Sequence, residues 1–131
     1  ESDLQAKQLH VALDLAEQLP QFRLDCDQMT QVLLNILINA MQATDPGGQI
    51  TIGAHVQPDT NRLELTITDT GKGMAPADLP KIFDPFFSTK KQGAGLGLAI
   101  ADTIIANHHG EIMAESSPGK GSTFRIYLPV A

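Results

Sequence analysis

The segment "LELTITDTGKGM", residues 63–74, alternates apolar and polar side chains and then changes abruptly into a glycine-rich turn. A period of two is typical of a β-strand with one buried face, and it places Asp69 on the same face as the apolar residues before it. A carboxylate at the end of an apolar face needs a hydrogen-bond donor. Two donors remain open: the backbone of a turn that begins at Asp69, and an exocyclic amine of a ligand whose ring approaches the backbone at Gly71 and Gly73.

Other segments with the same period extend this strand into a sheet. Residues 50–56 alternate in the same way and lead into residue 63 through the turn-forming segment "QPDTN", which predicts a hairpin. Further strands are predicted at residues 9–15, 111–115 and 123–128, and the turn "SSPGKG" joins the last two.

Two segments have the periodicity and the ends of helices. Asp25, with Gln28 three residues later, resembles a capping box, and apolar residues then continue to Ala43, just before "DPGG". A second helix is predicted over residues 96–108, with Gly110 as its C′ glycine. Strands and helices do not alternate strictly, so we predict a two-layer α/β sandwich: a mixed, mostly antiparallel sheet of about five strands packed against about three helices on one face.

Composition excludes several classes of protein. A chain of 131 residues with 42% hydrophobic residues predicts one globular domain. The net charge of −6, with no basic block longer than Lys90-Lys91, argues against a nucleic-acid face. The single cysteine, Cys26, excludes an internal disulfide and a multi-cysteine zinc site. The longest apolar stretch, residues 32–41, is too short to span a membrane, so we expect a soluble domain. The single cysteine suits a reducing, cytoplasmic compartment, and the abrupt start in "ESDLQAK" suggests a fragment of a larger protein.

The first helix carries an uncharged polar stripe. Gln28, Gln31, Asn35, Asn39 and Gln42 follow one another at three- and four-residue steps. One interpretation is a solvent-facing edge of an amphipathic helix. The other is that the amide oxygens of Asn35 and Asn39 bind a hard cation that already carries phosphate ligands, as magnesium prefers.

The segment "KKQGAGLGLAI", residues 90–100, places Gly93, Gly95 and Gly97 directly before the second helix. No Lys-Ser/Thr pair closes it, which excludes a Walker motif, and a long loop rather than a strand precedes it, which makes it a poor dinucleotide fingerprint. A glycine-rich segment before a helix N-terminus can still bind phosphate through backbone N–H groups. Residues 70–95 are dense in glycine and proline, which predicts a functional or disordered loop.

Five motifs occur in a fixed order along the chain. They are Asn-x-x-x-Asn-Ala at 35–40, Asp-x-Gly-x-Gly-Met at 69–74, Phe-Asp-Pro-Phe-Phe at 83–87, Gly-x-Gly-Leu-Gly-Leu at 93–98 and Gly-x-Gly-Ser-Thr-Phe at 119–124. Together they cover nearly the whole chain, which resembles the catalytic ATP-binding domain of bacterial sensor histidine kinases. These kinases share a superfamily with DNA gyrase B, heat-shock chaperone ATPases and MutL.

The resemblance implies a fold and an activity. The fold would be of the Bergerat type, with ATP between the helices and the sheet under a mobile lid. Residues 1–131 would form a single catalytic ATP-binding domain that binds Mg-ATP and transfers the γ-phosphate to a histidine on a separate dimerisation domain. That dimerisation domain is absent here, so this protein histidine kinase would not complete phosphate transfer without it. The full kinase would be a dimer that passes phosphate to a response regulator, and this domain would contact neither nucleic acid nor membrane.

The resemblance also implies roles for individual residues. Asn39 would bind Mg²⁺, Asn35 would assist at the phosphates and is a second candidate metal ligand, and Asp69 would accept a hydrogen bond from the adenine amine. Lys90 would contact phosphate and, with Asn35 and Asn39, form the catalytic set. Gly93, Gly95 and Gly97 would form the lid hinge and phosphate-facing backbone, and Phe83, Phe86 and Phe87 would anchor the lid. The implied ATP-binding set is Asn35, Asn39, Asp69, Gly71, Gly73, Met74, Lys90, Gly93, Gly95, Leu96, Gly97, Leu98, Ser122 and Thr123.

The sequence departs from the family pattern at three positions. Gln42 stands where many membrane sensor kinases have Lys, and Ser88 stands where they have Arg, so phosphate neutralisation would fall to Lys90 or Lys91. Ser122 replaces the usual Thr and keeps the hydroxyl group.

Three other activities remain open. ATP hydrolases of the superfamily carry a Glu general base at the position of Asn35, and because an amide cannot accept a proton from water, this substitution favours transfer over hydrolysis. A nucleotide-binding regulatory module without phosphotransfer is the second, and a serine kinase of the anti-sigma-factor type is the third.

None of the four histidines lies in the family's His-Glu-hydrophobic-Arg/Lys acceptor context. His10 and His55 fall on the polar faces of predicted strands. His108 and His109 end a helix whose dipole favours the imidazolium form, which is a poor nucleophile. The phosphate acceptor is therefore expected on another domain.

Overall fold

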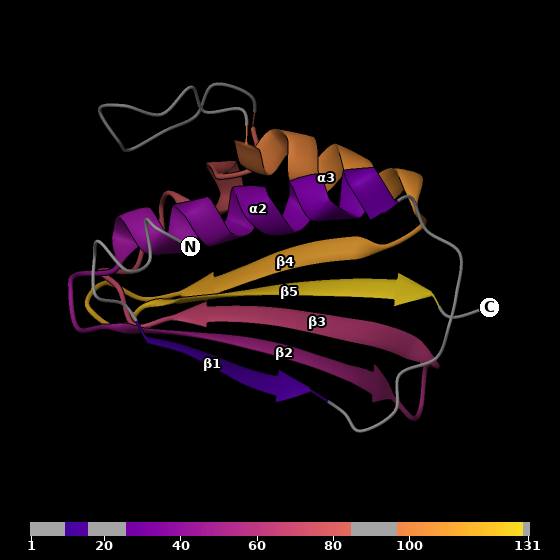
Figure 1. The fold of residues 1–131 in the computed structure, drawn as a ribbon. Helices are drawn as coiled ribbons and strands as arrows, with labels where there is room; N and C mark the ends of the chain where they lie inside the picture. Colours follow the sequence, from indigo (N-terminus) through magenta and orange to yellow (C-terminus); the bar gives the residue numbers. More distant parts are fainter. Residues whose placement is uncertain (1–9, 16–25, 85–96, 130–131) are drawn as a thin grey trace.

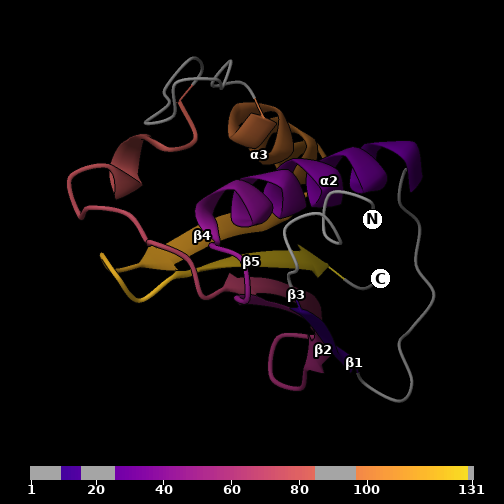
Figure 2. The same cartoon turned by 60° about the vertical axis from the view of Figure 1, so that its left-hand side comes forward.

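The computed structural model describes residues 10–15, 26–84 and 97–129. A sheet forms one layer, and the two long helices, α2 and α3, lie side by side across one of its faces (Figures 1 and 2). In chain order the elements are β1 (His10–Leu15), α2 (Cys26–Ala43), β2 (Gln49–Gln57), β3 (Arg62–Asp69), the 3-10 turn η1 (Leu79–Lys81), α3 (Gly97–Asn107), β4 (Glu111–Ser116) and β5 (Ser122–Pro129).

The five strands follow the order β1-β2-β3-β5-β4. β1 pairs with β2 in parallel, and the other three pairs are antiparallel, which confirms the predicted mixed, mostly antiparallel sheet. In the described part of the chain the helical layer contains two α-helices and one 3-10 turn, where the sequence predicted about three helices. The register sets Asp69 opposite Ile50 on one side and opposite Ser122 on the other.

The core lies between the helices and the sheet. The fully buried residues of α2 recur at steps of three and four, as expected for a helix with one apolar stripe, and those of β5 alternate. Burying each of the larger side chains (Val, Leu, Ile, Phe and Met) contributes about 1.5–3 kcal/mol to stability. The buried residues that meet here are Met29, Val32, Ile36 and Ala40 from α2, Ala101, Ile104 and Ile105 from α3, and Ile50, Leu63, Ile67, Phe124, Ile126 and Leu128 from the sheet.

The helix-free face of the sheet is covered by its own long polar side chains. Arg125 donates to Glu115 at 2.9 Å and to Glu64 at 3.1 Å, and the Arg62 guanidinium lies 4.6 Å from the centre of the Tyr127 ring. The hydrogen bond to Glu115 raises the pKa of Arg125, and burial raises the pKa of the Tyr127 hydroxyl. Both groups therefore keep their neutral-pH protonation states.

The end of α2 is set by the sequence that follows it. Thr44 is 1% exposed, and its hydroxyl donates to the Ala40 carbonyl at 2.7 Å. The Gly48 N–H then donates to the Asp45 carbonyl at 3.0 Å and closes a turn. A side chain at Gly48 would collide with the Thr44 methyl group. The predicted stop at "DPGG" is confirmed.

The end of α3 differs from the prediction at one position. His109, with φ of 63°, is the left-handed residue, and Gly110 is the residue after it. The N–H of His109 donates to Ala106 and that of Gly110 to Ile105, which is the hydrogen-bond pattern of a Schellman motif with His109 at C′. The prediction of Gly110 as C′ was wrong, because His109 is the left-handed residue. Gly110 is required for another reason: a side chain at this position would collide with the carbonyl oxygen of Tyr127.

We expect His109→Gly to stabilise the chain. A left-handed backbone costs a non-glycine residue about 1–2 kcal/mol, and His109→Gly removes this cost. Glycine also gives the unfolded chain more conformational freedom, which lowers the free energy of unfolding by about 0.4–1 kcal/mol. The net effect should be an increase of about 0.5–1 kcal/mol in the free energy of unfolding, measured by urea titration. His109→Ala is the control because it keeps the strained backbone, and equal stability of the two variants would contradict the assignment of His109 as C′.

Candidate functional site

The candidate site begins at the last residue of β3. Asp69 is 2% exposed, and it lies on the face of the sheet that packs against the helices. Its Oδ1 atom accepts a hydrogen bond from the backbone N–H of Gly71 at 2.8 Å. The sequence left two candidate donors for this carboxylate, and the structure shows that the turn backbone is one of them.

The loop after Asp69 is tied to three other segments through its backbone. The N–H of Thr70 donates to the Gln49 carbonyl at 3.1 Å, and the Thr70 hydroxyl accepts from the Gln49 N–H at 2.9 Å. The N–H of Lys72 donates to the carbonyl of Ala43, the last residue of α2, at 3.0 Å. The Lys72 carbonyl accepts from Gly119, in the β4–β5 turn, at 2.7 Å. These bonds place the loop between α2, β2 and the β4–β5 turn.

The glycines of this region are required by contacts between backbones. A Cβ at Gly71 would collide with the Ala43 carbonyl, and one at Gly73, where φ is +73°, would collide with the Ser117 carbonyl. Gly121, with φ of +81°, lies in the same way against the Asp69 carbonyl. The sequence attributed Gly71 and Gly73 to the approach of a ligand ring, and the structure provides another reason for both.

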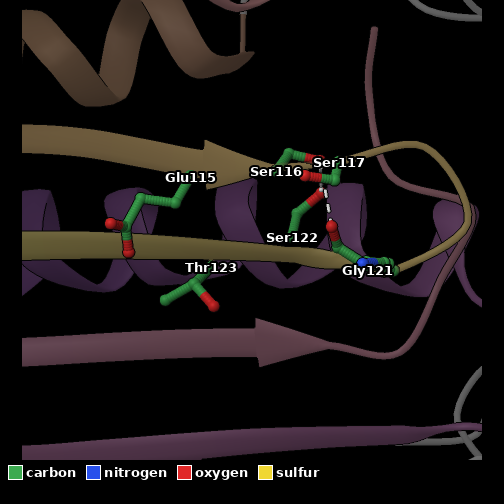
Figure 3. Close-up of a pocket in the computed structure, with 7 residues that line it drawn as sticks. Glu115, Ser116, Ser117, Gly121, Ser122 and Thr123 are labelled. Atoms are coloured by element: carbon green, nitrogen blue, oxygen red, sulfur yellow. Dashed lines mark hydrogen bonds between the residues drawn. The ribbon is translucent and has the colours of Figure 1, made fainter. Parts of the chain in front are cut away.

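Ser116 joins the two glycine-rich segments, and the sequence analysis did not single it out. Its Oγ accepts from the Met74 N–H at 2.7 Å, donates to the Gly121 carbonyl at 2.9 Å and lies 2.9 Å from the Ser122 hydroxyl (Figure 3). Because Ser116 has one proton and gives it to Gly121, Ser122 is the donor in the last bond. The sequence feature that could have identified Ser116 is its position opposite Ser122, across the turn that joins β4 and β5.

Ser122 and Thr123 lie on opposite faces of β5. A shallow pocket of about 180 Å³ spans this end of the β4–β5 hairpin, where the Ser122 side chain points toward Ser116 and that of Thr123 points away (Figure 3). The Thr123 hydroxyl lies 3.2 Å from that of Thr68. The structure therefore brings the Ser122 side chain, but not that of Thr123, to the face that carries Asp69. The pocket is lined by Glu115, Ser116, Ser117, Lys120, Gly121, Ser122 and Thr123.

The polar stripe of α2 divides into exposed and half-buried parts. Gln28, Gln31 and Gln42 are exposed, as the solvent-facing interpretation predicts, whereas Asn35 and Asn39 are half-buried. The Asn35 Nδ2 donates to the carbonyl of Gly97, the first residue of α3, at 2.9 Å. Asn35 thus joins the two helices across 62 positions of sequence.

Other predicted site residues pack against the core or lie outside the described residues. Met74 and Leu98 are partly buried against the core cluster. The ring of Phe83 also packs there, edge-on to Phe124 with centroids 6.3 Å apart. The residues outside the described part are Phe86, Phe87, Ser88, Lys90, Lys91, Gly93, Gly95 and Leu96.

Residues 10–15, 26–84 and 97–129 contain no group of three or more His, Cys, Asp or Glu side chains arranged to hold a metal ion. Within these ranges, the helices are too short or too polar to cross a lipid bilayer.

Comparison with known proteins gives consistent matches. A family model described as "Histidine kinase-, DNA gyrase B-, and HSP90-like ATPase" matches residues 24–131. The sensor histidine kinase ZraS of Salmonella typhi is 44% identical over 128 residues, which cover 98% of this chain but only 27% of that protein.

Solved structures of sensor histidine kinases share the fold at more than 25% sequence identity, and two of them illustrate it. The mycobacterial sensor histidine kinase MprB has a TM-score of 0.85 and 27% identity, and the match covers 98% of this chain and 89% of that one. Full-length ShkA in complex with AMPPNP has a TM-score of 0.87 and 31% identity, over 99% of this chain and 27% of that one.

We expect Ser116→Ala to destabilise the chain because it removes the partner of three polar groups at once. Leaving a partly buried donor or acceptor unsatisfied costs about 1–3 kcal/mol, and this range is the expected loss in the free energy of unfolding. Ser117→Ala is the matched control: its side chain is exposed, so the change should stay within about 0.5 kcal/mol. Equal denaturant midpoints for the two variants would contradict the role of Ser116 in joining the glycine-rich segments.

Proposed function

Because this chain belongs to the histidine kinase-, DNA gyrase B- and HSP90-like ATPase family, we propose that it binds Mg-ATP and transfers the γ-phosphate to a histidine on a separate domain of a two-component sensor kinase. The chain covers about a quarter of the curated relative described above, so the acceptor domain belongs to the proposal. The proposed partners are that dimerisation domain, in a dimeric kinase, and a response regulator downstream.

The observation that carries the proposal is the buried carboxylate of Asp69. The hydrogen bond from Gly71 uses Oδ1, and a carboxylate has about four lone-pair directions for donors. An adenine amine is a donor of the kind that a carboxylate binds well, and a charge-assisted bond in a partly dry site is stronger than a neutral one. Asp69, with Gly71 and Gly73 beside it, is therefore the proposed adenine-binding element.

The described residues fit magnesium only as a companion of the nucleotide. They contain no cluster of charged ligands that would hold a metal by itself, and Mg²⁺ is commonly bound by one or two protein oxygens together with phosphates and water. Asn39, half-buried on α2, is the proposed protein ligand through its amide oxygen. When bound, the ion would neutralise the charge on the phosphate oxygens. Lys90 is the proposed second cation at the phosphates.

An amide side chain at position 35 favours phosphate transfer over hydrolysis. Its Nδ2 donates to Gly97, and its Oδ1 accepts from Gln31 at 3.0 Å. An amide oxygen is not basic enough to take a proton from an attacking water, so Asn35 cannot act as the general base that hydrolysis needs. A serine kinase and a regulatory nucleotide-binding module remain the competing activities, and the last experiment below separates them.

Three of the described histidines, His55, His108 and His109, lie away from Asp69 and from the start of α3. His108 follows α3 at the end opposite to Gly97, and its Nδ1 donates to the Ile104 carbonyl at 2.9 Å. His109 caps α3, and His55 is exposed on the helix-free side of β2, away from Asp69. An acceptor histidine on another domain would instead be positioned beside the γ-phosphate, where alignment and electrostatics carry phosphoryl transfer.

We expect Asp69→Asn to weaken Mg-ATP binding about 10- to 100-fold, because a hydrogen bond to a charged group contributes about 1.5–3 kcal/mol. Asn retains an oxygen for the Gly71 N–H, so the turn and the fold should persist, which thermal unfolding checks. Asp45→Asn makes the same charge change at an exposed turn position and should bind like the parent. Calorimetric titration measures both, and parental affinity in Asp69→Asn would refute the adenine assignment.

We expect radiolabelled ATP to leave no acid-labile label on this chain alone. Label should appear on a separate helical domain that carries a His-Glu acceptor motif when it is added with Mg²⁺, and chelation should abolish it. Release of inorganic phosphate without label would indicate a hydrolase, acid-stable label a serine kinase, and binding without either product a regulatory module. Stoichiometric phosphohistidine on the isolated chain would contradict the need for a second domain.

A further inference from the structure

The first turn of α3 is held only weakly by apolar burial. Residues 97–99 are half-buried and Ile100 is 41% exposed, whereas Ala101, in the next turn, is fully buried. Leu98 packs against the core, but a helix end with few fully buried side chains frays more easily than the middle of the helix, because each residue that opens loses less contact area. A polar contact at this end therefore has a large influence on where the helix begins.

That contact is a chain of two hydrogen bonds. The Asn35 Nδ2 donates to the Gly97 carbonyl at 2.9 Å, and the Gln31 Nε2 donates to the Asn35 Oδ1 at 3.0 Å. A carbonyl can only accept, so the atom of Asn35 that faces Gly97 must be the nitrogen, and the oxygen must face Gln31. One orientation of both amides satisfies every group.

We infer that Gln31 and Asn35 form a positioning relay that fixes the start of α3, and with it the last glycine of the 93–97 cluster, relative to the Asn39 side chain. This inference rests on the proposed function, because it concerns how the proposed phosphate-facing parts are aligned. Asn35 then acts through its contact with Gly97, and its Oδ1 is oriented by the donor of Gln31.

Helix geometry separates Gln31 from direct contact with the phosphates. Asn39 lies one turn beyond Asn35, about 6 Å along the helix axis, and Gln31 lies about 12 Å from Asn39 in the same direction. Gln31 is exposed, and its one described hydrogen-bond partner is Asn35. An effect of Gln31 on nucleotide affinity must therefore pass through Asn35 and Gly97.

The test is Gln31→Glu in the 131-residue chain. A carboxylate beside the Asn35 Oδ1 sets acceptor against acceptor, which drives the Asn35 amide to turn and brings its oxygen against the Gly97 carbonyl. We expect Mg-ATP affinity to fall about five- to tenfold, the effect of one neutral hydrogen bond. In the nucleotide-free chain, hydrogen exchange at Ala101, whose N–H pairs with Gly97 in a regular helix, should become faster. Gln31→Leu, which removes the donor without repulsion, should give a smaller loss.

Gln28→Glu is the matched control, since it places the same charge on an exposed position of the same helix about one turn earlier. It should retain parental affinity and parental exchange. The inference is overturned if Gln31→Glu and Gln28→Glu agree in both measurements, or if the affinity loss only follows a lower urea midpoint. Failure of the parent chain to bind Mg-ATP would refute the proposed function, while exchange at Ala101 in the nucleotide-free chain would still test the relay.

Discussion

Close packing of backbone segments around the end of β3 is the constraint on which the rest of the structure depends. The loop after Asp69 passes so near the end of α2 and the β4–β5 turn that side chains at Gly71, Gly73 and Gly121 would collide with carbonyl oxygens. Glycine is destabilising in most contexts because of the entropy that it loses on folding. Here it allows the sheet, the helix and the hairpin to meet at one point.

This packing explains why so few side chains are needed to organise the candidate site. The Asp69 carboxylate is held by the N–H of Gly71, and the Ser116 hydroxyl joins Met74 to the β4–β5 turn. Nearly all the other links are backbone hydrogen bonds, whose geometry changes little with side-chain identity. A site built this way is preorganised before any ligand binds, which lowers the entropy cost of binding.

The helical layer contributes the part of the proposed site that is held by fewer contacts. α3 is anchored by Ala101, Ile104 and Ile105, all beyond its first turn, and the first turn is joined to α2 by Asn35. The sheet side of the proposed site is thus held by several backbone bonds, whereas the helix side depends on a polar contact. Such a difference suits a family in which a lid is expected to open and close over nucleotide while the base-binding side stays fixed.

Local patterns in the sequence determined the strands of the hairpins, the bounds of both helices to within one or two residues in the described part, and the burial of Asp69, because alternation, periodicity and turn residues act over a few positions. Motif order was enough to identify the family before any contact was known. Only the tertiary structure decided that β1 pairs in parallel with β2, that His109 rather than Gly110 is left-handed, that Ser122 but not Thr123 faces Asp69's side of the sheet, and that Asn35 binds Gly97. The pairing of β1 with β2 and the contact of Asn35 with Gly97 depend on segments that meet in space rather than in sequence. Gly110 is required because a side chain there would collide with the carbonyl of Tyr127, and a local sequence pattern cannot predict this contact.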